Sequence, residues 1–470
     1  MWLYNYRKDL IPPVPPALQL LFDQGHEVGR LAWQRFPGGR FIEEDHRHAV
    51  QAMESTRAAL QAGACALYEP AAEFDGVLVR ADILLRQESG AWDLVEVKSS
   101  TDVEEVYLHD VAVQRYVLEG AGLAIRKTFL MHLDNKYARR GSIDVGKLFA
   151  LADVTQQASE ALEDVPARVK VMHAVLAQRE VPDVEIGPQC YAPYECEFVR
   201  FCWADVPDYS VFDLAGASME KKTALWRQGV RTVQDIPGGF PLTKGQSLQA
   251  EAARSGRPLV DPGGIAELLE GLSYPLHFLD FETINPAIPP YDGLRPFQQL
   301  PFQASVRVRG SKGAALESLE YLGGGAEDPR PGLIEFLLGA IGPSGSVLAY
   351  NASFEGRCLK ELGESSPRHA RRLESIKERL WDLAGPFRKG LYVHPDFRGS
   401  WSIKAVLPAL VPEMSYAGLA IRDGSQAQAA YARLMRGALG HEEAEQIRRD
   451  LKEYCGQDTL AMVKLLDRLG

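Results

Sequence analysis

The feature that most constrains this chain is an apolar run, His277-Phe-Leu-Asp-Phe-Glu-Thr283, in which two acidic residues stand one residue apart. In an extended strand, residues i and i+2 point to the same side, so Asp280 and Glu282 are expected to converge on one cation. The plain alternative is a strand end whose acidic side chains face water, because such triplets are common. Acidic residues in two later segments favour the cation site over this alternative.

Two later segments add acidic residues in matching contexts. In the run Val347–Gly356, a strand is predicted to end at Tyr350, and Asn351 is placed where it could cap the following helix. Glu355 then falls in the first helical turn. In Tyr454-Cys-Gly-Gln-Asp458, the i and i+4 positions share one helix face, which places the tyrosine hydroxyl beside the carboxylate.

Together the three segments resemble the motifs of the DnaQ-like 3′–5′ exonucleases, in the subclass that uses tyrosine. The stretch Ser402-Ile-Lys-Ala-Val-Leu407 also resembles that family's helix between its second and third motifs. The resemblance implies a ribonuclease H-like fold that hydrolyses phosphodiester bonds with two Mg²⁺ or Mn²⁺ ions. The implied metal ligands are Asp280, Glu282, Glu355 and Asp458, and Tyr454 would orient the attacking water.

One position departs from that family. The family usually has aspartate where this chain has Glu355, and the extra methylene moves the carboxylate by about one bond length. The fold is therefore better supported than the activity.

A second acidic pattern lies nearer the N-terminus. Asp82 is followed by Glu96 and Lys98, which share one face of the predicted strand Trp92–Val97, and Gln114 lies on a later helix. Two carboxylates can hold Mg²⁺, and an ammonium can stabilise the charge that develops on a reacting phosphate. A solvated edge strand is the plain alternative. The pattern resembles the PD-(D/E)XK nucleases of the RecB-like branch, which implies a restriction-endonuclease-like fold.

This segment also departs from its relatives. They carry a histidine four residues after a helical glycine, and that position after Gly25 is Gly29 in this chain. His26 is adjacent in sequence but is expected to point elsewhere and to be exposed. The missing histidine is a potential metal ligand, so its loss counts against nuclease activity at this site.

Three of the six cysteines, Cys190, Cys196 and Cys202, fall within a short segment with C-x5-C-x5-C spacing. A close cysteine cluster in a cytosolic protein indicates metal or iron–sulfur ligation, and three free thiols are the plain alternative. The segment resembles the C-terminal clasp of iron–sulfur RecB-like nucleases, which implies a 4Fe–4S cluster, with zinc as the competing metal. Cys65 is expected to be buried at the start of a core strand. We therefore expect the fourth ligand upstream of Met1.

The bulk composition fits a globular α/β protein with several domains. The chain has 470 residues, 46% of them hydrophobic and 24% charged. It has no apolar run long enough to span a bilayer and no secretion signal, so a cytoplasmic location is expected. The net charge of −11 does not exclude nucleic acid, because bound cations would reverse the local sign at acidic sites.

The predicted organisation has four parts. They are a RecB-like domain over 1–180, a cysteine clasp over 181–205, a helical connector over 206–270 and a ribonuclease H-like domain over 271–470. The predicted helices of the first domain are 15–37, 49–62, 102–119 and 145–179, and its predicted strands are 66–74, 77–86, 92–97 and 127–133.

As a whole, the chain resembles the prokaryotic family called domain of unknown function 2779, which joins a RecB-like module to an exonuclease-like module. The resemblance implies a metal-dependent nuclease acting on nucleic acid, DNA more than RNA. The alternative is a nucleic-acid-binding or scaffold protein that keeps the nuclease folds without activity, which the departures at Glu355 and Gly29 favour.

Overall fold

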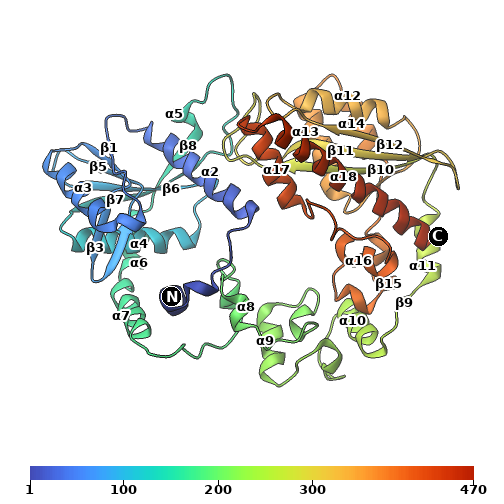
Figure 1. Ribbon diagram of the computed structural model, residues 1–470, viewed down its shortest axis with the longest axis horizontal. Coiled ribbons are helices and arrows are strands. Elements are labelled where there is room, and N and C mark those ends of the chain that lie inside the picture. The colour runs from blue at the N-terminus through green and yellow to red at the C-terminus, as the bar shows by residue number, and fades with distance from the viewer. The chain divides into compact units, whose positions relative to one another are not determined.

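The computed structural model describes all 470 residues and shows a mixed α/β protein with several sheets (Figure 1). The chain divides into two compact units. The first comprises Met1–Val184 and Asn285–Gln298, and the second comprises Glu185–Ile284 and Gln299–Gly470.

The first unit is built on a six-stranded mixed sheet with the order β1-β2-β5-β6-β7-β8. The pairs β1–β2 and β6–β7 are parallel, and the other pairs are antiparallel. The strands are β1 (Arg40–Phe41), β2 (Ala66–Tyr68), β5 (Ile83–Arg86), β6 (Trp92–Lys98), β7 (Ile125–Leu133) and β8 (Phe149–Asp153).

Helices cover both faces of this sheet, because its central strands are apolar on both sides. On β6, Leu94 packs in one buried cluster and Val95 in another, as side chains of alternating direction must. Helix α2 (Pro16–Trp33) contributes to the cluster that holds Val95. Helices α3 (Ala49–Gln61) and α4 (Glu105–Gly120) contribute to the cluster that holds Leu94.

Most predicted elements of this unit are confirmed within a few residues, but two predicted strands are wrong in extent. The runs 66–74 and 77–86 are each broken in two, and a separate hairpin forms from β3 (Ala71–Phe74) and β4 (Val77–Arg80). Glu69 has a φ of 58°, and Pro70 has no backbone N–H to donate to a ladder, so the first run cannot continue as one strand.

The predicted long helix over 145–179 is also wrong. The segment holds α5 (Val145–Leu148), strand β8, α6 (Thr155–Leu162) and α7 (Val165–Leu176). Phe149-Ala-Leu-Ala-Asp153 has good helix formers, but it pairs antiparallel with β7 and closes the sheet edge, so tertiary pairing overrides local propensity.

The second unit contains a five-stranded sheet with the order β12-β11-β10-β13-β14. Strand β10 is its centre, antiparallel to β11 and parallel to β13. The strands are β10 (Leu276–Ile284), β11 (Leu300–Arg309), β12 (Leu316–Leu322), β13 (Val347–Ala349) and β14 (Leu380–Asp382).

The two faces of this sheet differ in character. One face is an apolar core, formed by Leu279 and Phe281 of β10 with α12 (Arg330–Ala340), α13 (Ser353–Ser365) and α14 (Ala370–Lys377). The other face meets the C-terminal helix α18 (His441–Leu469) through polar side chains. Gln303 donates to the Leu451 carbonyl, and Ser305 hydrogen-bonds to Thr459. The alternation of β10 therefore directs Asp280 and Glu282 to the polar face.

The connector in the second unit has its own small apolar core, which includes Val211, Leu225 and Val233. Its strand β9 (Leu259–Val260) pairs with β15 (Tyr392–Val393). The remaining helices of four or more residues are α1 (Trp2–Tyr6), α8 (Val199–Cys202), α9 (Met219–Arg227), α10 (Lys244–Ser255), α11 (Pro262–Leu269), α15 (Gly385–Arg388), α16 (Ile403–Leu410) and α17 (Gly424–Arg436). None of the helices combines the length and apolar content that a bilayer crossing requires.

Candidate functional site

The four acidic side chains singled out in the C-terminal half lie close enough to one another to interact electrostatically. Asp280 and Glu282 come from β10, Glu355 from the first turn of α13, and Asp458 from the middle of α18. The charges of Asp458, Glu282 and Glu355 all raise the pKa of Asp280. Strand alternation, a helix start and helix periodicity thus bring distant residues to one point.

The carboxylates of this cluster are held away from water, and that burial is the main cause of their altered acidity. Glu282 and Asp458 are each 7% exposed, and Glu355 is 2% exposed. Burial raises the pKa of Glu355 to about 8 and that of Asp458 to about 6. Burial and the charge of Asp458 raise the pKa of Glu282 well above its usual range. At neutral pH the cluster therefore disfavours its own full ionisation.

Few protein groups offset this negative charge. Tyr416 donates a hydrogen bond of 2.5 Å to Asp458 Oδ1, and Tyr454 lies close enough to Asp458 for the two groups to shift each other's pKa. The Lys404 ammonium lies 5.8 Å from the Tyr416 ring centre and 5.5 Å from that of Tyr454. Its charge lowers the pKa of both Glu282 and Asp458. Lys404 thus acts on two of the four carboxylates, and the charge of Arg357 opposes the burial that raises the pKa of Glu355.

Glu355 contains the clearest unmet binding capacity of the cluster. Its Oε2 atom is buried and has no hydrogen-bond partner. Backbone geometry fixes its position: Asn351 has a φ of 70°, and its N–H donates to Asp382 Oδ1 at 2.9 Å. The predicted cap at Asn351 is wrong by one residue, because Ala352 is the N-cap of α13. Asparagine tolerates the left-handed conformation, which lets the chain turn sharply from strand to helix.

The N-terminal acidic residues also meet, but with a cation among them. Lys98 Nζ lies 2.8 Å from Glu96 Oε1 and 2.5 Å from Asp110 Oδ2. Gln114 Nε2 donates to Glu96 Oε2 at 2.8 Å, and Asp82 Oδ2 accepts the Val97 N–H at 2.6 Å. Glu96, Lys98 and Gln114 thus form one hydrogen-bonded group. Asp82 is held beside it on the backbone of β6.

Burial again shifts the pKa values of this group, and the lysine opposes the shift. Burial and the charges of Glu96 and Glu69 raise the pKa of Asp82 well above its usual range. Burial raises the pKa of Glu96, while Lys98 lowers it. Burial raises the pKa of Glu69, and Arg80 opposes this shift; His26 is exposed, as predicted.

The three clustered cysteines lie near one another in the second unit. The Cys196 N–H donates to the Cys190 carbonyl at 2.9 Å. Burial and the charges of Cys190 and Cys196 raise the pKa of Cys202. All three thiols are free and partly or fully exposed. The prediction that Cys65 is buried is wrong: it is exposed, at the position just before β2.

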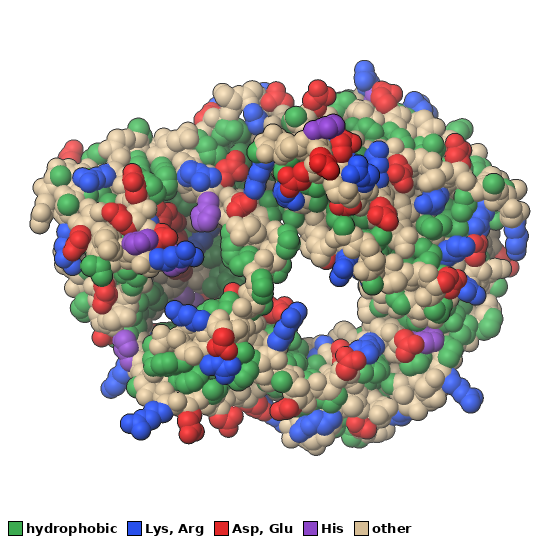
Figure 2. All heavy atoms as spheres, viewed as in Figure 1, with side chains coloured by type: hydrophobic (Ala, Val, Ile, Leu, Met, Phe, Trp, Pro, Cys, Tyr) green, Lys and Arg blue, Asp and Glu red, His purple; other side chains and the backbone are tan.

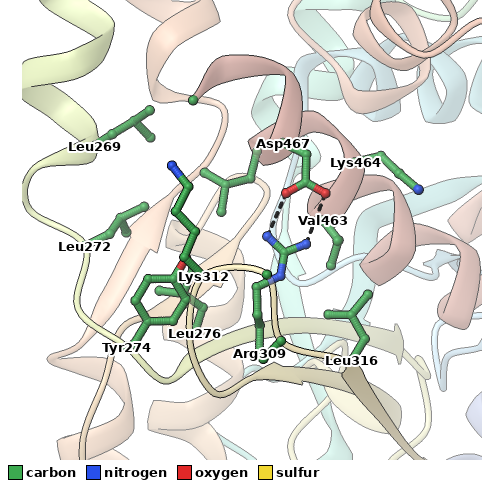
Figure 3. A pocket seen from close by; sticks show the side chains of 14 residues that line it. Leu269, Leu272, Tyr274, Leu276, Arg309, Lys312, Leu316, Val463, Lys464 and Asp467 are labelled. Carbon is green, nitrogen blue, oxygen red and sulfur yellow. Dashed lines mark hydrogen bonds and ion pairs between the residues drawn. The ribbon is translucent and has the colours of Figure 1, made fainter.

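A cavity of about 720 Å³ lies elsewhere in the second unit (Figure 3). It is lined near the start of β10 and the end of α18 by Leu276, Leu316 and Val463. Figure 3 shows the Arg309 guanidinium facing Asp467, at 2.6 and 3.0 Å. This pair neutralises its own charge, and none of the four clustered carboxylates lines the cavity.

Sequence reasoning missed three residues of the C-terminal cluster. Tyr416 comes from a loop with no motif of its own. Lys404 lies inside the segment Ser402–Leu407, which was singled out only as a helix. Cys455 has no motif of its own, and its buried Sγ lies 3.4 Å from Asp280 Oδ2. The adjacency of Cys455 to Tyr454 is the one signal that could have indicated its position.

Fold and sites together define a two-unit α/β protein with two clusters of buried and half-buried carboxylates and one cysteine cluster. Residues 277–402 match the family model described as domain of unknown function 2779. The matched region contains three of the four C-terminal carboxylates, and Asp458 lies beyond it.

Two relatives are uncharacterized proteins of bacteria. The one from Ureaplasma parvum is 29% identical over 207 residues, which cover 40% of this chain and 30% of the relative. The one from Mycoplasma pneumoniae is 28% identical over 206 residues, which cover 40% of this chain and 31% of the relative. The match thus spans about a third of the length of each relative.

Proposed function

We propose that this chain is a metal-dependent nuclease that hydrolyses phosphodiester bonds, with a 3′–5′ exonuclease-type centre in its second unit. The observation that carries the proposal is a group of four interacting carboxylates, three of them buried, whose charge Lys404 and Arg357 offset only in part. Such an arrangement is costly unless cations offset the charge. Paired cations are the means by which many phosphodiesterases stabilise attacking and leaving oxygens.

The arrangement of elements supports a ribonuclease H-like fold for this region. A central strand is antiparallel to one neighbour and parallel to the other, with helices on both faces. The carboxylates come from that central strand, from the helix after β13 and from the last helix. This is the placement that the resemblance to DnaQ-like exonucleases implies.

The donor set fits Mg²⁺ or Mn²⁺. Asp280, Glu282, Glu355 and Asp458 offer only oxygen atoms, which these cations prefer. The unpartnered Oε2 of Glu355 is a buried acceptor aimed at no protein donor, which a cation would satisfy. When bound, such cations would supply an activated water and would stabilise the charge of the reacting phosphate.

The neighbouring side chains have roles that follow from their contacts. Tyr416 holds the Asp458 carboxylate in one orientation through its 2.5 Å hydrogen bond. Tyr454 is positioned to orient the attacking water, as the resemblance implies. Lys404, beside both tyrosine rings, is the available cation to contact a substrate phosphate oxygen.

For the first unit, we infer a PD-(D/E)XK site of the RecB-like type at Asp82, Glu96 and Lys98, supported by Gln114. The sheet with helices on both faces and the meeting of these residues favour it. Gln114 Oε1 is buried without a partner. The pairing of Lys98 with both Glu96 and Asp110 instead favours the second candidate function, a nucleic-acid-binding or scaffold module without catalysis.

The cysteine cluster is proposed to bind a 4Fe–4S cluster, or zinc, through Cys190, Cys196 and Cys202. Mutual proximity of three free thiols supports ligation, and a fourth ligand is still required. Metal analysis with visible absorption of anaerobically purified protein distinguishes the two metals. Protein with neither iron nor zinc would contradict both.

The proposed partner is nucleic acid, with DNA favoured over RNA. Figure 2 shows acidic and basic side chains interspersed on the visible face, so binding is expected to depend on the metal centres more than on a broad basic surface. A cytoplasmic location stays a prediction from the sequence.

Hydrolysis of end-labelled single strands tests the C-terminal centre. Wild-type protein with Mn²⁺ or Mg²⁺ should shorten linear DNA from its 3′ end, and chelator should stop the reaction. Asp280→Asn should lower the rate by at least about 100-fold. Glu364→Gln is the matched control, since this carboxylate lies exposed on the same helix as Glu355. Equal rates for Asp280→Asn and wild type would reject the proposal, and faster RNA cleavage would reverse the substrate preference.

Circular single-stranded DNA separates the two sites, because it has no end for an exonuclease. If the first unit is catalytic, wild type and Asp280→Asn should both open the circle, and Asp82→Asn should not. Intact circles with every variant would leave the first unit with a binding role.

A further inference from the structure

One sulfur atom lies inside the oxygen cluster of the second unit. Cys455 is fully buried on α18, between Tyr454 and Asp458. Its Sγ lies 3.4 Å from Asp280 Oδ2 and 3.9 Å from the Asp280 backbone carbonyl oxygen. One ligand atom each from Asp280, Glu282 and Cys455 lies within 4.8 Å of the others. Three potential donors therefore surround one small volume.

The separations match a cation that accepts sulfur. Zinc–sulfur bonds are about 2.3 Å and zinc–oxygen bonds about 2.0–2.2 Å, so a tetrahedral centre places its sulfur and oxygen ligands roughly 3.5 Å apart. The observed 3.4 Å between Cys455 Sγ and Asp280 Oδ2 fits that edge. Mg²⁺ takes oxygen ligands, so the thiol adds nothing to its binding. The sulfur therefore distinguishes between classes of cation.

A second observation at the same place points to a ligand. Glu355 is 2% exposed, its Oε2 has no hydrogen-bond partner, and its charge acts on both Asp280 and Glu282. A further oxygen donor, buried and without a partner, thus lies close enough to act on both carboxylates of the group. Buried acceptors without partners are rare in folded proteins and call for an unseen partner.

We propose that Asp280, Glu282 and Cys455 form a binding site for a thiophilic divalent cation of the zinc class. Binding replaces the S–H bond of Cys455 with a metal–sulfur bond, and the thiol proton passes to solvent. The site uses Asp280 and Glu282, so its occupation excludes Mg²⁺ from them. The resulting inhibition of hydrolysis rests on the proposed function, whereas the binding itself does not.

Cadmium binding tests the site directly. In full-length protein carrying Cys65→Ser, Cys190→Ser, Cys196→Ser and Cys202→Ser, the remaining thiols are Cys358 and Cys455. Titration with Cd²⁺ should produce the ultraviolet sulfur-to-cadmium charge-transfer band with one equivalent bound. Adding Cys455→Ser should abolish the band. Cys358 is the matched control, because it is equally buried and lies near Glu355, and Cys358→Ser should keep the band.

A variant that keeps both thiols guards against misfolding. Glu282→Gln should weaken Cd²⁺ binding at least tenfold while the band at saturation persists. Unchanged affinity in Glu282→Gln, or a band that survives Cys455→Ser, would overturn the proposal. Loss of nuclease activity does not affect this readout, so an inactive protein that binds Cd²⁺ refutes only the proposed function. An active protein without the band refutes only the thiolate site.

Discussion

The two carboxylate clusters of this protein answer the same electrostatic problem in different ways. In the first unit, Lys98 contacts Glu96 directly, so a protein cation offsets the buried charge. In the second unit, Lys404 acts on the cluster from beside two tyrosine rings, and Glu355 keeps an unpartnered oxygen. The first cluster therefore includes its own cation, whereas the second is proposed to take cations from solution.

That difference predicts opposite signs for charge removal. Deleting a charge from a neutralised group exposes its partners, and deleting one from a group of like charges relieves repulsion. Matched variants test this difference through two quantities: the free energy of unfolding and the change in unfolding temperature when a divalent cation is added.

The largest effect is expected from Lys98→Met. The substitution leaves Glu96 buried without its cation, and breaking such a pair costs about 3 kcal/mol of unfolding free energy. Chemical denaturation of the metal-free protein measures the loss. Lys127→Met is the matched control, because Lys127 and Asp153 are both more than 40% exposed, and it should cost below about 1 kcal/mol. Equal losses for the two variants would show that Lys98 is not part of a buried pair.

Divalent cations should stabilise the second unit more than the first. A ligand at about 100 times its dissociation constant adds roughly 2.7 kcal/mol to folded-state stability. Saturating Mn²⁺ should therefore raise the unfolding temperature of wild type. Asp280→Asn should remove most of this increase, and Asp82→Asn should keep most of it. The reverse order would place the dominant metal site in the first unit.

Glu355→Gln should stabilise the metal-free protein at high pH. The folded pKa of Glu355 is about 8 and its ordinary value is 4.5, so the folded state binds the proton more tightly. The stability that this proton gives is fully present below pH 4.5 and is lost as the pH rises through 8. The variant should exceed wild type by roughly 2 kcal/mol at pH 9, since its amide is itself buried without a partner. Because the cost of that amide does not change with pH, the variant should fall below wild type near pH 4, where Glu355 is protonated, and denaturation across this range measures the crossing.

Local periodicity was enough to place most of the candidate residues on the correct elements. Asp280 and Glu282 share one side of β10 because they are two residues apart, and Tyr454 and Asp458 share a face of α18 because they are four apart. Spacing within a single strand or helix fixes which side chains share a face, so such placements can be predicted from the sequence.

What the sequence could not predict depends on how elements pack. Tyr416 reaches Asp458 across 42 positions, and Cys455 meets Asp280 only through the register of α18 on β10. The strand at Phe149–Asp153 exists because an edge of β7 is open to it, although its residues favour a helix. The sequence likewise did not predict the ion pair between Lys98 and Asp110, because it depends on how α4 packs beside β6.

The smallest expected effect is that of a single hydroxyl in the second cluster. Tyr416→Phe removes the donor to Asp458, which should cost about 1 kcal/mol of stability and weaken Mn²⁺ binding about tenfold, because the carboxylate loses its fixed orientation. Tyr454→Phe should leave Mn²⁺ affinity nearly unchanged and slow the hydrolysis of DNA, because Tyr454 is proposed to orient water. Isothermal titration with Mn²⁺ and single-turnover hydrolysis separate the two roles. Equal losses of affinity in both variants would mean that the two tyrosines act together on Asp458.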